Sequence, residues 1–144
     1  MKLSEHFTLQ EMTFSETASR HELDNTPGPE ELANLHRIAN LLEQVRSLVG
    51  KPIIVTSGYR SPAVNKAVGS KSKNSAHTHG LAADIKALGM TPAALAAIIK
   101  TSDIKFDQLI LEFDRWVHIG LREGAPRLEL LTIRAGTGYM RGIV

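Results

Sequence analysis

The chain contains no cysteine among its 144 residues. This absence excludes a disulfide scaffold, a thiolate metal site and a cysteine nucleophile. Any transition metal must therefore be held by His, Asp or Glu side chains. Aromatic residues make up only 5% of the chain, and no basic patch with interleaved aromatics is visible. We therefore expect no nucleic acid as a partner.

Neither sign of charge dominates the composition. Seventeen Lys and Arg residues oppose fifteen Asp and Glu residues, which leaves a net charge of +2 and names no partner by itself. No apolar run approaches the ~20 residues of a membrane span, and Met1 to Thr8 lacks the apolar run of a signal peptide. We expect the chain to stay in the cytoplasm of the cell that makes it unless another factor releases it.

Hydrophobic residues make up 42% of the chain, enough to bury the core of one domain. Apolar residues recur every three or four positions from Pro29 to Val49 and predict the main amphipathic helix, with Gly50 after its end. Thr91 and Pro92 begin a second helix that runs to Lys100. Strands are expected over 53–56, 81–86 and 128–133, and over 106–113 and 116–121, which form either two strands or one bent strand. A short helix is expected over 61–67, a polar loop over 69–75 and a turn over 136–139.

These elements predict a single α+β domain over residues 1–144. It consists of a small, mainly antiparallel sheet with helices packed on it, and residues 1–28 form an N-terminal arm on this domain. Along 81–86, Leu81, Ala83 and Ile85 alternate with more polar positions. This alternation predicts a half-buried strand that carries Asp84 on its less apolar face.

Three polar residues, His77, Asp84 and His118, lie on the non-core sides of these strands or in their entry loops. A catalytic zinc takes three protein ligands and leaves its fourth position to water, and two imidazoles with one carboxylate form such a set. Spacing alone is weak evidence for a site, because six histidines in 144 residues place some pair near an Asp by chance.

A longer string surrounds these residues. Residues 75–84 have the form S-x-H-x-x-G-x-A-x-D, residues 57–61 before them read SGYRS, and residues 116–118 after them read WVH. This combination resembles the M15 metallopeptidases, the zinc D-alanyl-D-alanine carboxypeptidase and dipeptidase group that includes phage endolysin peptidases. The resemblance covers roughly residues 30 to 120 and implies the M15, DD-peptidase-like fold.

The resemblance also implies roles for particular residues. His77, Asp84 and His118 would bind one zinc ion per chain, and Arg60 would contact substrate. In several family members the catalytic base is a carboxylate three residues before the last His, but Arg115 occupies that position here. Glu112 and Asp114 are the candidates for the base. A tight turn over 113–115 would return Glu112 beside His118 and leave Asp114 at the tip, so we favour Glu112.

Four neighbours of the motifs are further candidates for substrate or supporting contacts. Ser75 is expected to fix the His77 loop by hydrogen bonding, and Trp116 to pack against the site. Tyr59 either walls the pocket or covers the end of a strand. His79 lies two residues from His77, so it either joins the metal or lies near the site or on the surface.

The resemblance implies a hydrolase that cleaves an amide bond in peptidoglycan stem peptides. It would act as a D,D-carboxypeptidase or as an endolysin-type endopeptidase, by metal-activated water and a Glu base. We expect bacterial peptidoglycan as the partner, a monomer, and a phage lysis or virion enzyme that reaches the cell wall by a holin or with the particle. The alternative is a non-catalytic cell-wall-binding or virion structural module that retains the peptidase fold.

Overall fold

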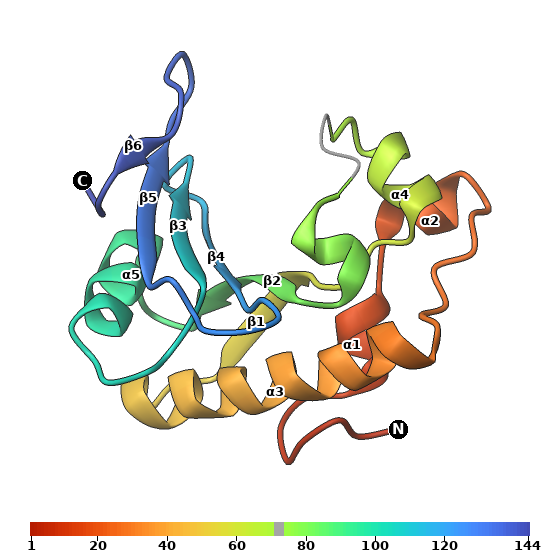
Figure 1. Cartoon of the computed structure of the whole chain (residues 1–144), viewed down its shortest axis with the longest axis horizontal. Coiled ribbons are helices and arrows are strands. Elements are labelled where there is room, and N and C mark those ends of the chain that lie inside the picture. Colours follow the sequence, from red (N-terminus) through yellow and green to blue (C-terminus); the bar gives the residue numbers. More distant parts are fainter. Residues whose placement is uncertain (71–73) are drawn as a thin grey trace.

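The computed structural model describes residues 1–70 and 74–144. The predicted polar loop over 69–75 therefore lies partly outside the described residues. The predicted α+β architecture is confirmed: helices pack on a six-stranded sheet with the order β1-β2-β4-β3-β5-β6, as Figure 1 shows. None of the helices in the described ranges combines the length and apolar content that a membrane span requires.

Helix α3 has the predicted bounds, Pro29–Val49. Pro29 occupies its first turn, where a missing N–H costs nothing, and Glu30 and Glu31 lie near the positive end of the helix dipole. Gly50 ends the helix in the left-handed conformation. One face of α3 is buried, and it carries Leu35, Ile38, Ala39, Leu41, Leu42 and Val45.

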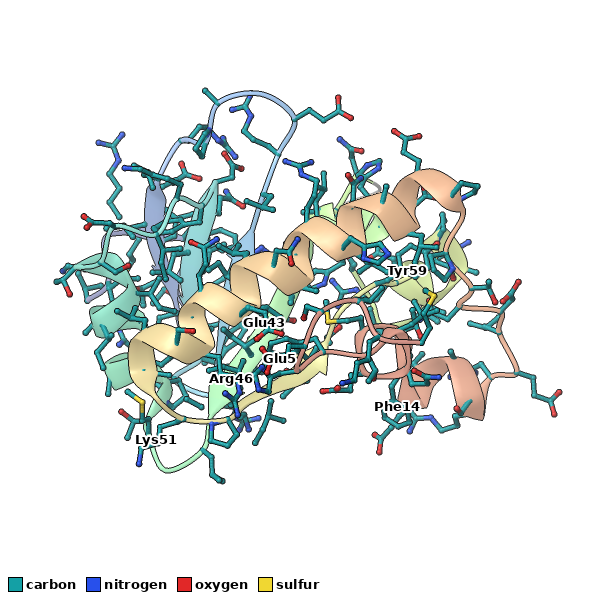
Figure 2. All side chains as sticks on the ribbon, turned by 90° about the horizontal axis from the view of Figure 1, so that it is seen from below. Glu5, Phe14, Glu43, Arg46, Lys51 and Tyr59 are labelled. Atoms are coloured by element: carbon teal, nitrogen blue, oxygen red, sulfur yellow. The ribbon has the colours of Figure 1, made fainter. Side chains whose placement is uncertain are left out.

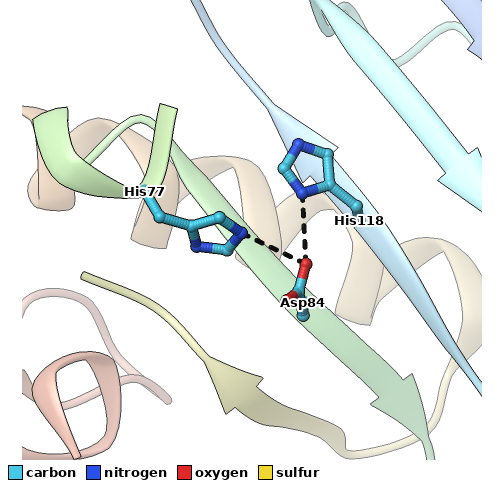
Figure 3. A group of neighbouring side chains, drawn as sticks. All are labelled: His77, Asp84 and His118. Carbon is cyan, nitrogen blue, oxygen red and sulfur yellow. Dashed lines mark hydrogen bonds and ion pairs between the residues drawn. The ribbon is translucent and has the colours of Figure 1, made fainter. Parts of the chain in front are cut away.

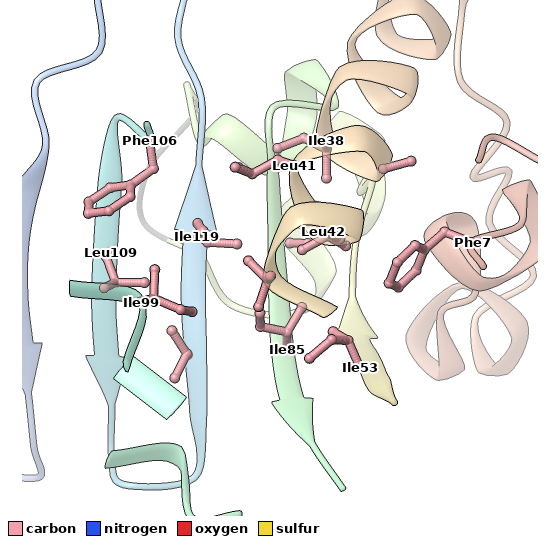
Figure 4. Packing of buried hydrophobic residues seen from close by; sticks show 14 of the residues in the cluster. Phe7, Ile38, Leu41, Leu42, Ile53, Ile85, Ile99, Phe106, Leu109 and Ile119 are labelled. Carbon is pink, nitrogen blue, oxygen red and sulfur yellow. The ribbon is translucent and has the colours of Figure 1, made fainter. Parts of the chain in front are cut away.

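The sheet carries α3 and α5 (Pro92–Lys100) on one face. These helices contact each other, α3 also contacts β1 (Ile53–Ser57), and α5 contacts the central strands. The core between helices and sheet appears in Figure 4 and is built mainly of aliphatic side chains. Its largest fully buried members include Phe7, Leu42, Ile85, Ile99, Leu109 and Ile119.

The three central strands are antiparallel neighbours: β2 (Ala82–Ala87), β4 (Trp116–Gly120) and β3 (Gln108–Glu112). Leu109 faces Ile119 and Leu111 faces Val117 on the core side. The alternate positions, Ile110 and Glu112 on β3 with His118 on β4, consequently face away from the helices.

Strand β2 differs from the expected half-buried strand. All residues from Ala82 to Ile85 are buried, because the core covers one face and the short 3-10 helix η1 (Ala76–His79) contacts the strand as well. Asp84 is therefore a buried carboxylate, and the prediction of a half-buried strand is wrong.

The C-terminal strands extend the sheet beyond β3. Strand β5 (Glu129–Ile133) runs parallel to β3, and β6 (Met140–Arg141), a strand that the sequence did not predict, pairs antiparallel with β5. Arg127 donates to both carboxylate oxygens of Asp107, at 2.9 and 2.8 Å. This pair holds the start of β5 against the start of β3.

The N-terminal arm contains two short helices, α1 (Leu9–Thr13) and α2 (Glu16–Arg20). Figure 2 shows this arm beside α3, close to Glu43. The Glu43 carboxylate accepts hydrogen bonds from the Ser4 hydroxyl and the His6 backbone N–H, both at 2.6 Å. Helix α4 (Pro62–Ala67) contacts both α2 and η1.

Candidate metal centre

His77 is positioned by the short helix η1 and the turn that closes it. The Ser75 hydroxyl accepts a hydrogen bond from the His77 N–H at 3.3 Å, as predicted. Gly80 ends η1 at φ +71°, and a Cβ at this position would lie 2.5 Å from the carbonyl oxygen of Glu31 in α3. Only glycine fits both the backbone conformation and the close approach of the helix.

Asp84 and His118 are positioned by the sheet itself. They are direct partners in the antiparallel register of β2 and β4, where Cβ atoms of opposed residues lie about 4.5–5.5 Å apart. Asp84 Oδ1 lies 3.1 Å from Nδ1 of His118 and 3.3 Å from Nε2 of His77.

The three side chains converge from η1, β2 and β4, as Figure 3 shows. One ligand atom from each residue lies within 4.8 Å of the other two, and all three residues are buried. The imidazole rings meet edge to face, with their centroids 5.1 Å apart. The structure therefore brings His77, Asp84 and His118 together as a group that can hold a metal ion.

The donor set fits zinc. His77 Nδ1 lies 2.7 Å from the carbonyl oxygen of Gly58, which can only accept, so Nδ1 carries the proton and Nε2 presents a lone pair. That lone pair faces the Asp84 carboxylate at 3.3 Å, and a cation held between these two acceptors would stabilise the arrangement. Ligand atoms around a tetrahedral zinc lie about 3.3–3.6 Å from one another.

Burial and the charge of Asp84 shift the pKa values of the residues in the site. Burial lowers the pKa of His77, because it disfavours the imidazolium form. Burial acts against the charge of Asp84 too, but the two histidines outweigh it and hold the pKa of that carboxyl well below its usual range. For His118, burial is outweighed by the hydrogen bond and charge of Asp84, and the pKa is raised.

Glu112 lies beside this group, and Asp114 does not. Glu112 Oε2 is 3.8 Å from His118 Nδ1, because residues 113 and 114 turn the chain with positive φ angles and bring Glu112 opposite Trp116. Burial and the Asp84 charge raise the pKa of Glu112. Asp114 lies at the tip of the turn, half exposed, and pairs with Arg134 at 2.9 Å.

The group lines a cleft of about 420 Å³. Arg60 and Glu112 also line it, which places a guanidinium and a carboxylate near the three candidate ligands. Arg60 follows β1 and is tied to η1, because its backbone N–H donates to the carbonyl of His77 at 3.1 Å. Burial lowers the pKa of Arg60, while the charges of Asp84 and Glu112 oppose this shift.

A family model described as Peptidase M15 matches residues 5–120 of this chain. The chain belongs to the M15 peptidase family. The match contains all three candidate ligands together with Arg60 and Glu112, and it confirms the family resemblance of the sequence motifs. A search of curated proteins returns no match.

In this M15 chain, Ser75 and Trp116 line the cleft beside the candidate ligands, and two other candidate residues, Tyr59 and His79, do not. Tyr59 is only 4% exposed and belongs to the hydrophobic core, so it does not wall the cleft. His79 is exposed, and its Nε2 lies 2.6 Å from Asn74 Oδ1. His79 stands outside the group of converging ligands.

The cleft also contains residues that the sequence reasoning missed. Gln108 and Ile110 line it from β3, Asn74 lines it from the position before the motif at 75–84, and Tyr139 lines it from beyond the last motif. Alternation with Glu112 on the same strand is a signal that identifies Gln108 and Ile110. Tyr139 lies in the tail that was expected to be only a turn, and no motif marks it.

Proposed function

We propose that this chain is a zinc-dependent peptidase that hydrolyses an amide bond in peptidoglycan stem peptides. The observation that carries the proposal is the buried His77–Asp84–His118 group in a cleft that also holds Glu112 and Arg60. The family match supports peptidase chemistry. The stem peptide as substrate comes from the motif resemblance.

His77 Nε2, Asp84 and His118 Nδ1 would hold the zinc. Zinc in such a site lowers the pKa of a bound water towards about 7 and polarises a carbonyl group. The Glu112 carboxylate is a proton acceptor outside the ligand group, at 3.8 Å from His118 Nδ1. We assign it as the base that takes a proton from the attacking water and passes it to the leaving amine.

The raised pKa of Glu112 suits this role. A base whose pKa is shifted upwards towards neutral pH binds the proton more readily and can then donate it. Arg60 is assigned to the substrate, where its guanidinium donates to a carboxylate or to the developing oxyanion. Both residues act from opposite sides of the metal group, because Arg60 follows β1 and Glu112 ends β3.

The test is mass spectrometry of the products formed from purified peptidoglycan by zinc-loaded protein, beside a chelated sample. Release of D-alanine identifies a D,D-carboxypeptidase, and a cut within the stem or crosslink identifies an endopeptidase. Either product must disappear after chelation. Unchanged peptidoglycan and unchanged soluble muropeptides, with zinc still bound, would overturn the proposal in favour of a non-catalytic wall-binding module.

A further inference from the structure

Tyr139 lines the wall of the cleft opposite Arg60 and lies beyond the part of the chain that matches the family model. Tyr139 lines the cleft together with the three candidate ligands, yet it lies nineteen residues beyond position 120, where the match ends. Its side chain is 61% exposed, so it is accessible to a bound molecule. The chemical role of this residue is therefore not set by the shared motifs.

The sheet register explains how Tyr139 reaches the site. Glu112 is in register with Ile133 of β5, and Met140 of β6 is opposite Thr132, the residue before Ile133. Continuing this register places Tyr139 opposite Ile133, which is itself opposite Glu112. The three residues are therefore neighbours across β3, β5 and the start of β6. Ile110 and Glu112 on β3 face the cleft, and Tyr139 joins them from the edge of the sheet.

A network of hydrogen bonds fixes the segment that carries Tyr139. Thr137 accepts a hydrogen bond from the Arg134 N–H at 2.9 Å and closes the turn. The Arg134 guanidinium donates to Asp114 at 2.9 Å and to the carbonyl of Val144 at 2.8 Å. The β5–β6 hairpin is thus tied to the β3–β4 turn and to the last residue, which gives Tyr139 a defined position.

Donors on this side of the cleft are scarce among the described residues. The Gln108 amide already donates to Glu129 at 2.6 Å. The indole nitrogen of Trp116 has no partner but is buried, which leaves it almost no surface from which to reach a bound molecule. The Tyr139 hydroxyl has no hydrogen-bond partner within the described part of the chain. Partial burial and the negative charges of Glu112 and Asp84 raise the pKa of Tyr139, so the phenol keeps its proton at neutral pH.

We propose that Tyr139 is a substrate-binding residue whose hydroxyl donates a hydrogen bond to a carbonyl or carboxylate oxygen of the stem peptide. It holds the substrate on the β3 side of the metal group, while Arg60 holds it on the β1 side. A peptide bound across the cleft has carbonyl oxygens on its β1 side and on its β3 side. Each of them needs a hydrogen-bond donor, because an unpaired carbonyl group is costly to bury. This inference rests on the proposed function.

The experiment compares wild type with Tyr139→Phe, which keeps the ring and removes only the hydroxyl. We expect kcat/KM for a soluble pentapeptide muropeptide to fall about 5- to 10-fold, as a lost hydrogen bond to substrate predicts. Zinc content and Tm should stay at the wild-type values. Met140→Leu in the same hairpin, opposite Thr132 in the register, is the matched control and should keep wild-type kinetics.

A second measurement separates binding from turnover. Calorimetry with the same muropeptide compares zinc-loaded Glu112→Gln with Glu112→Gln/Tyr139→Phe, and we expect Kd to rise about 5- to 10-fold in the double variant. Equal Kd values and equal kcat/KM would overturn the role of Tyr139. The wild type could also fail to hydrolyse the muropeptide while the double variant binds it more weakly. This result would support substrate binding by Tyr139 and overturn the peptidase proposal. Absence of binding in every variant would overturn both.

Discussion

Asp84 and His118 are opposed residues on adjacent strands, and their side chains meet at 3.1 Å. The backbone pairing of β2 and β4 therefore brings two of the three candidate ligands together without help from a metal ion. His77 is added by η1, which Gly80 seats against α3. A metal site built on paired strands is more rigid than one built on loops alone.

Zinc should stabilise the wild-type protein and not His118→Ala. A ligand present at 100 times its Kd adds about 2.7 kcal/mol to the free energy of unfolding, which for a domain of this size raises Tm by about 8 °C. Thermal unfolding with and without zinc measures this shift. His21→Ala, which removes an exposed histidine at the end of α2, should keep the full shift. A full shift in His118→Ala would contradict the ligand assignment.

Glu112→Gln should lose hydrolysis and retain zinc. Removal of a general base lowers turnover by about 10²- to 10⁴-fold, whereas the three candidate ligands remain in place. Product release from a muropeptide and the zinc content after dialysis provide the two readouts. Glu123→Gln, in the exposed loop after β4, is the matched control. Wild-type turnover by Glu112→Gln would move the base to another residue.

Gly80→Ala should destabilise the protein more than Gly89→Ala. Both glycines have positive φ, at +71° and +75°, but only at Gly80 would the new Cβ meet backbone, the Glu31 carbonyl at 2.5 Å. The left-handed conformation costs about 1–2 kcal/mol in each variant, and the contact adds about 1–3 kcal/mol in Gly80→Ala. Urea unfolding of the two variants measures the difference. Equal losses would show that α3 yields to the added methyl group.

Asp107→Asn should destabilise the protein at neutral pH and much less in acid. Hydrogen bonds from Arg127 lower the pKa of the Asp107 carboxyl below its usual value of 3.8. A carboxyl whose folded-state pKa is depressed stabilises the fold above its unfolded pKa, and this stabilisation disappears as pH falls through the folded pKa. We expect a loss of about 1.5–3 kcal/mol at pH 7, which shrinks below pH 4. A pH-independent difference between the two urea unfolding curves would refute this.

Much of the fold could be predicted from local sequence patterns. Helix α3 has the predicted bounds because Pro29 and Gly50 mark its ends and the apolar positions repeat with the helical period. A tight turn over 113–115 was expected to return Glu112 beside His118, and the structure has this turn between β3 and β4. In both cases the determining residues are neighbours in sequence.

The remainder depends on contacts between distant segments. The sequence of β5 is compatible with parallel or antiparallel pairing. Its parallel direction is set by its position beside β3 in the folded sheet. Asp84 is buried because β2 contacts η1 as well as the helix α5. Tyr59 follows a motif glycine but packs into the core, and Tyr139 reaches the cleft only because β6 forms. No local pattern carries this information.

The hairpin of β5 and β6 forms the edge of the sheet, one strand beyond β3 and two beyond His118. It is held there by pairing with β3 and by the Asp107–Arg127 and Asp114–Arg134 ion pairs. The hairpin contributes none of the three candidate ligands. Substitutions in this edge would therefore alter the proposed substrate contact at Tyr139 while leaving the candidate ligands in place.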